Sequence, residues 1–114
     1  MKALLLVAAL LAAEGFRARG FVLPDGAVKI DEDRYRFAEQ WDEVIKFYRR
    51  AYPGGKYPRR TLHSQTPIRA IHIANPSGID WEGANIYEAG RGEVRVYIIP
   101  GKEPPEPEKD KKPK

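Results

Sequence analysis

Residues 38–52 carry a helical pattern of apolar and polar positions. Apolar side chains recur there at helical spacing and form one stripe, which comprises Trp41, Val44, Ile45, Tyr48 and Tyr52. Acidic residues occupy the first turns of the segment and basic residues the last, an order that complements the helix dipole. The sequence Pro53-Gly54-Gly55 then ends the helix. We therefore expect one amphipathic helix whose stripe, Trp41 included, lies in the core.

The rest of the pattern alternates with a period of two, which is typical of strands. Residues 16–23 form a short lead-in, and two strands are expected around 28–30 and 34–37. After the helix, 61–65 and 68–75 alternate, and in the second segment Ile71 and Ile73 share a face with Arg69. Residues 81–89 and 93–99 read as a hairpin around Gly90-Arg91-Gly92, with Trp81 covering an edge of the core.

Runs of strands combined with a single helix favour the α+β class over a parallel βαβ fold. We expect one antiparallel sheet of about four or five strands with the helix packed across one face. Such a domain, residues 16–100, is large enough to fold alone around a single small core.

The two ends of the chain differ in composition from this domain. Residues 1–15 place one lysine before an apolar run from Ala3 to Ala13, and small residues follow. This is the order of a secretory signal peptide, and the run is too short for a membrane span. Cleavage is expected after Gly15, or alternatively after Ala13, so the protein is expected to be exported to the periplasm or the exterior. Residues 101–114, rich in proline and charge, are expected to be a disordered tail.

The composition excludes several kinds of chemistry. The chain has no cysteine, so it forms no disulfide, thiolate nucleophile, Cys-ligated metal site or lipid-modified cysteine. The formal net charge is +4.

Candidate catalytic groups are few. The two histidines, His63 and His72, match no metal-binding motif, and in a single strand their odd separation would put them on opposite faces. Ser64 follows His63, but neighbours on a strand point apart. Asp80 and Glu82 alternate around Trp81 and could form a carboxylate pair, although a small domain offers little room for a cleft. The sequence therefore predicts no enzyme, cofactor or metal. The alternative is a small hydrolase or metal-dependent enzyme built on His63, His72 and nearby carboxylates.

Charge order gives the clearest functional signal. Residues 44–79 contain no Asp or Glu, yet they carry seven Lys and Arg side chains with tyrosines between them. Arginine forks bind anionic groups, and aromatic faces bind sugars or bases. The candidate binding residues are Arg49, Arg50, Lys56, Tyr57, Arg59 and Arg60. The alternative is a solvated helix end and loop.

Several segments resemble small exported bacterial proteins of uncharacterised function. The resemblance is carried by the opening Leu23-Pro24-Asp25-Gly26-Ala27, by Trp41 with Phe47-Tyr48-Arg49-Arg50, by residues 71–75 and by Asn85-Ile86-Tyr87. It implies an exported domain with a closing antiparallel sheet, and no activity.

The sequence thus predicts a non-enzymatic exported binding or structural module with a basic loop. The partners expected for it are anionic polysaccharide, lipid headgroups or an acidic protein surface. Nucleic acid is the poorest match, because an exported protein seldom meets it.

Overall fold

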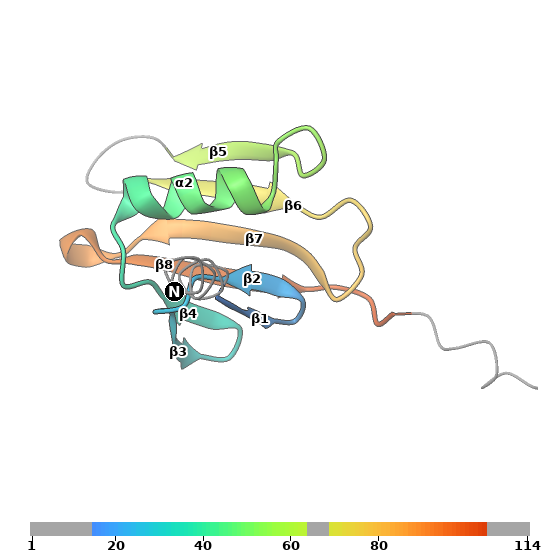
Figure 1. The fold of residues 1–114 in the computed structure, drawn as a ribbon, viewed down its shortest axis with the longest axis horizontal. Helices are drawn as coiled ribbons and strands as arrows, with labels where there is room; N and C mark the ends of the chain where they lie inside the picture. The colour runs from blue at the N-terminus through green and yellow to red at the C-terminus, as the bar shows by residue number, and fades with distance from the viewer. Residues whose placement is uncertain (1–14, 64–68, 105–114) are drawn as a thin grey trace, which may run out of the picture.

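A computed structural model describes residues 15–63 and 69–104 of the chain. This part of the protein has the expected α+β fold, with one α-helix and an antiparallel sheet (Figure 1). Its elements, in chain order, are β1 (Phe16–Ala18), β2 (Phe21–Leu23), β3 (Val28–Asp31), β4 (Arg34–Arg36), α2 (Trp41–Ala51), β5 (Arg59–His63), β6 (Ala70–Ala74), β7 (Trp81–Glu88), the 3-10 turn η1 (Gly90–Gly92) and β8 (Val94–Pro100).

The main sheet is larger than the sequence predicts. Within the described residues it has six strands in the order β3-β4-β8-β7-β6-β5, and every neighbouring pair is antiparallel. The expected hairpin of β7 and β8 forms its centre. The lead-in, residues 16–23, forms a separate hairpin of β1 and β2. Its two-residue turn, Arg19-Gly20, has positive φ at both positions, as a tight right-twisted hairpin requires.

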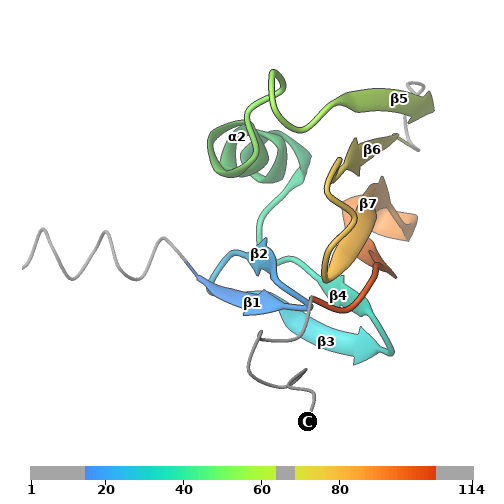
Figure 2. The same cartoon turned by 90° about the vertical axis from the view of Figure 1, so that its right-hand side faces the viewer.

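Helix α2 and the β1–β2 hairpin cover the same face of the sheet (Figures 1 and 2). The core lies between these layers, and alternate residues of each central strand point into it, for example Val94, Val96 and Ile98 of β8, all fully buried. From the helix, Val44 and Tyr48 are buried as predicted. Trp41 is only half-buried and packs at the edge, so its expected place in the core is wrong, whereas Trp81 is 4% exposed.

Two tyrosines of the helical stripe bind the hairpin to the helix. The Tyr48 hydroxyl donates to the carbonyl of Val22 at 2.8 Å, and the Val22 amide donates to the Tyr52 hydroxyl at 2.9 Å. The ring of Phe21 stacks on both tyrosines, with centroids 5.1 and 5.4 Å away, and meets Trp81 edge-on. The hydroxyls therefore satisfy backbone groups of β2 that no neighbouring strand of the described structure satisfies.

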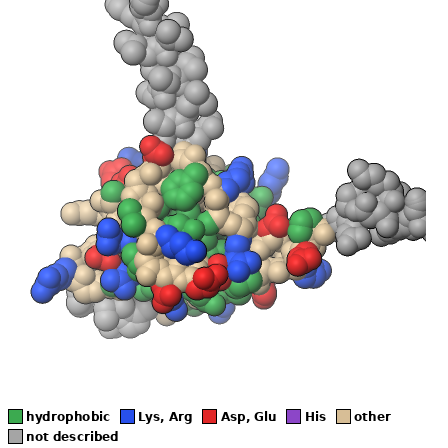
Figure 3. Space-filling view, turned by 90° about the horizontal axis from the view of Figure 1, so that it is seen from below, with side chains coloured by type: hydrophobic (Ala, Val, Ile, Leu, Met, Phe, Trp, Pro, Cys, Tyr) green, Lys and Arg blue, Asp and Glu red, His purple; other side chains and the backbone are tan. Residues whose placement is uncertain are grey.

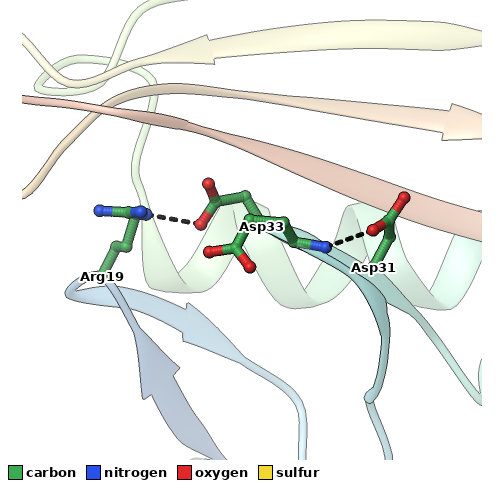
Figure 4. Close-up of polar contacts among 4 residues, drawn as sticks. Arg19, Asp31 and Asp33 are labelled. Atoms are coloured by element: carbon green, nitrogen blue, oxygen red, sulfur yellow. Dashed lines mark hydrogen bonds and ion pairs between the residues drawn. The ribbon is translucent and has the colours of Figure 1, made fainter.

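Charged groups link the two hairpins at their turns. Arg19 of the β1–β2 turn pairs with Asp33 of the β3–β4 turn at 2.5 Å, and Asp31 accepts a hydrogen bond from the Glu32 amide (Figure 4). Arg19 is exposed, so this pair adds little stability but fixes the relative position of the turns.

The contacts of the domain continue just past its expected end at Pro100. The Asp80 amide donates to the Lys102 carbonyl and the Lys102 amide to the Gly78 carbonyl, both at 2.7 Å. Gly101 passes so close to the Gly78 carbonyl and the backbone of Trp81 that a Cβ would collide with both. The expected signal peptide and all but the first residues of the expected tail lie outside the described residues. None of the described helices is long and apolar enough to span a membrane.

Candidate functional site

A basic groove runs between α2 and the β5 edge of the sheet. It has a volume of about 330 Å³. Its lining includes four arginines and no acidic residue, and consists of Trp41, Ile45, Arg49, Arg59, Arg60, Thr61, Arg69 and Ile71. Three of the residues predicted to bind, Arg49, Arg59 and Arg60, therefore meet at one place, and Trp41 and Arg69 join them.

Arg59 is held in the wall of this groove. Its register opposite Ile73 turns it toward the helix, where its guanidinium donates to the Tyr52 carbonyl at the helix C-terminus. The Nε–H is buried and has no hydrogen-bond partner among the described residues. Burial, and then the positive charge of Arg49, lower the pKa of Arg59. A half-buried cation next to a second cation lacks a compensating charge, which an anionic ligand would supply.

Arg69 forms the opposite wall and is already neutralised. Its Nε and one terminal nitrogen bind the two carboxylate oxygens of Glu88 at 3.0 and 2.9 Å. This two-point contact lowers the pKa of Glu88 although burial of the carboxyl opposes the shift. The guanidinium also lies 5.1 Å from the ring centroid of Trp41. Arg69 therefore shapes the groove, while Arg49 and Arg59 supply its unbalanced charge. Arg60 lines the groove at the β5 edge, but its register opposite His72 puts its side chain on the other face of the sheet.

Sequence reasoning placed Arg69 on the correct face, beside Ile71 and Ile73, but did not assign it to the site. The signal that could have identified Arg69 is Glu88, an acidic residue at a core-facing position of β7. Among the described residues Glu88 is the buried acidic one. A buried carboxylate needs a cationic partner, and Arg69 is the basic residue on the neighbouring segment.

The remaining predicted binding residues do not join this groove. Lys56 is exposed in the turn after the helix, and Arg50 faces a different hollow, beside Lys46 and Phe47. Tyr57 extends the core: its ring stacks on Trp81 with centroids 6.2 Å apart and meets Tyr52 edge-on at 4.7 Å. The loop is therefore not one continuous basic and aromatic surface.

Comparison with protein-family models, with curated proteins and with solved structures gave no match. The resemblance to exported bacterial proteins stays a prediction.

A larger hollow of about 800 Å³ lies between the β1–β2 hairpin and α2. Its charged lining is mixed, with Arg17, Lys46 and Arg50 against Asp25, Glu39 and Glu43. A lining of both signs selects no charged ligand. The side of the molecule seen in Figure 3 also shows acidic and basic side chains around hydrophobic ones. Phe16 of β1 and Val28 of β3 are among the exposed large hydrophobic residues of the described structure.

The residues considered for catalysis are dispersed. His72 lies on the sheet face away from the helix, where its Nδ1 bonds the Asn85 side-chain oxygen at 2.7 Å. Asp80 and Glu82 are exposed on either side of the buried Trp81. The side chain of His63, together with Ser64, lies outside the described residues. In the part of the chain that the structure describes, no three His, Asp or Glu side chains gather in a metal-binding cluster.

Proposed function

We propose that this protein is a non-enzymatic, exported binding module that holds an anionic group of an envelope component in the groove between α2 and β5. The observation that carries the proposal is Arg59: its Nε–H is buried and unpaired among the described residues, and Arg49 lies close enough to lower its pKa. Two guanidinium groups without a carboxylate beside them attract an anion.

The ligand group that fits is a carboxylate, sulfate or phosphate. Arg59 is preorganised by its bond to the Tyr52 carbonyl, so it loses little side-chain freedom on binding. Arg49 is exposed at the groove mouth, where it steers an approaching anion. Acidic polysaccharides, lipid headgroups and acidic protein surfaces all present such groups.

The test compares two single charge removals. Arg49→Gln removes a groove cation that makes no hydrogen bond to other described side chains, so folding should be unchanged. Arg91→Gln removes the same charge from η1, at the end of the β7–β8 hairpin, where Arg91 is exposed. Binding of dextran sulfate at low salt is measured by titration calorimetry.

We expect Arg49→Gln to weaken binding about tenfold, as for one lost charge-assisted contact of about 1.5 kcal/mol. Arg91→Gln should change it less than twofold. Equal losses in the two variants would show that only net charge matters, and the groove would not be the site. The same conclusion follows if the parent does not bind at all.

A further inference from the structure

The sheet has a second face, which points away from α2 and the β1–β2 hairpin. No described element covers it, as the edge-on view in Figure 2 shows. The strand pairing places one residue from each of five adjacent strands in a continuous row on this face, in the order Arg34, Tyr97, Asn85, His72 and Arg60. Adjacent strands lie about 4.8 Å apart, so the row spans roughly 19 Å. We call it the outer row.

Arg34, at one end of the outer row, is fixed in place without a carboxylate. Its guanidinium carbon lies 4.5 Å from the ring centroid of Tyr97, and one terminal nitrogen donates to the Tyr87 hydroxyl at 2.8 Å. Asp31 stands opposite it on β3 but forms no ion pair with it. Two tyrosines therefore hold the guanidinium still, and its other N–H groups remain for a ligand.

More positive charge lies beside Arg34. Arg36 and Arg95 stand directly opposite one another on β4 and β8. Like charges in directly opposed positions destabilise a strand pair. Glu93 pairs with Arg95 at 2.6 Å, whereas Arg36 and Arg34 form no ion pair with another described residue. An anionic group bound there would relieve the repulsion.

The middle of the outer row is neutral and forms hydrogen bonds. The Nδ1 of His72 donates to the Asn85 side-chain oxygen, because an amide oxygen can only accept, and Nε2 is the second polar atom of the ring. The imidazole lies over Gly83: a Cβ there would be 2.5 Å from its Cε1. The Asn85 amide nitrogen, the Tyr97 hydroxyl and His72 Nε2 thus offer donors and acceptors between two cationic ends.

We propose that this outer face binds an acidic polysaccharide that lies across the strands, with its carboxylates on Arg34 and Arg36 and its hydroxyls on the neutral middle of the outer row. Single-stranded nucleic acid fits less well, because it needs free aromatic faces for its bases, and Arg34 occupies a face of Tyr97. A lipid surface fits less well because the middle of the row is polar. The face is separate from the groove: Arg59 points toward the helix, and Arg60, its neighbour, belongs to the outer row.

The experiment titrates the full chain with polygalacturonate at low salt, with neutral dextran, oligothymidylate and anionic phosphatidylglycerol vesicles as alternative ligands. The outer-face variant is Arg34→Gln with Arg36→Gln, and the matched control is Arg91→Gln. The groove variant Arg49→Gln reports separately on binding in the groove. Gly83→Ala displaces the His72 ring without changing charge. Circular dichroism checks that each variant is folded.

We expect the double variant to lose polygalacturonate affinity by tenfold or more, Gly83→Ala by a few-fold, and the control Arg91→Gln by less than twofold. Dextran should not bind measurably. Unchanged binding by the double variant overturns the proposal, as does a loss confined to Arg49→Gln, which would assign the polysaccharide to the groove instead. Stronger binding of oligothymidylate or of the vesicles than of polygalacturonate refutes the choice of ligand.

Discussion

The two hydroxyl contacts to Val22 give the sharpest test of the fold. In Tyr48→Phe the ring still fills its site, but the Val22 carbonyl loses the donor that lies 2.8 Å away. Tyr48 is fully buried and Val22 half-buried, so the carbonyl regains water only in part. An unsatisfied group of this kind costs about 1–2 kcal/mol. In a domain of this size each kcal/mol lowers Tm by roughly 4–8 °C, so the expected fall is about 4–16 °C.

The second hydroxyl allows a double-mutant cycle. Tyr52→Phe removes the acceptor of the Val22 amide and should cost about as much as Tyr48→Phe. Both bonds hold the same residue of the same hairpin, so losing one loosens the other. The loss in the free energy of unfolding of the double variant should therefore be smaller than the sum of the two single losses, by about 0.5 kcal/mol or more. Urea denaturation followed by circular dichroism measures all three free energies of unfolding.

Tyr57→Phe is the matched control. Its ring packs on Trp81 and Tyr52, but its hydroxyl makes no hydrogen bond within the described residues. We expect it to change the free energy of unfolding by less than about 0.5 kcal/mol. If Tyr48→Phe costs no more than this control, the hydroxyl does not hold β2, and the hairpin is not bound to the helix as described here.

Two further predictions concern the same core. Burial raises the pKa of Tyr48 well above its usual range and that of Tyr52 to a lesser degree. The unfolded chain ionises its tyrosines near pH 10, so the free energy of unfolding should keep its full value below that pH and fall as the pH rises above it. Urea midpoints across the alkaline range measure this dependence, and Tyr48→Phe should make the fall smaller. Trp81→Ala should lower the free energy of unfolding by about 3–5 kcal/mol, and Trp41→Ala by clearly less, because Trp41 is half-buried. Chemical denaturation measures both losses, and a larger loss in Trp41→Ala would contradict the burial pattern.

Local patterns predicted the elements that carry their own periodicity. The helix was recognised from its stripe, with ends displaced by one to three residues, and the β7–β8 hairpin from strict alternation around a glycine-rich turn. The β1–β2 hairpin left no comparable signal. Its strands have three residues each, and the Val22 backbone is satisfied by hydroxyls 26 and 30 residues further along the chain. Contacts at that separation are set by tertiary packing, which no local window of sequence contains.

The wrong prediction that Trp41 lies in the core has a related cause. A stripe at helical spacing shows which side of a helix faces the protein, but not how far along the axis the opposing layer extends. Trp41 occupies the first position of α2, beyond the part of the helix that packs on Phe21 and the central strands. There it lines the groove beside Arg69 instead of filling the core.

Residues 44–79 show why a charge pattern in the sequence predicts a positive electrostatic potential more readily than a particular binding site. The absence of acidic residues from 44–79 predicts an excess of positive charge between the helix end and β6. Strand pairing decides how this positive charge is divided between the two faces of the sheet. Arg59 stands opposite Ile73 and points toward the helix, whereas Arg60 stands opposite His72 and points to the outer face. A shift of one residue in this register would exchange the two arginines. Arg59 and Arg60 therefore point to two different surfaces. An anion bound in the groove and a polysaccharide bound on the outer face would weaken each other's binding only through long-range electrostatic repulsion, which salt screens.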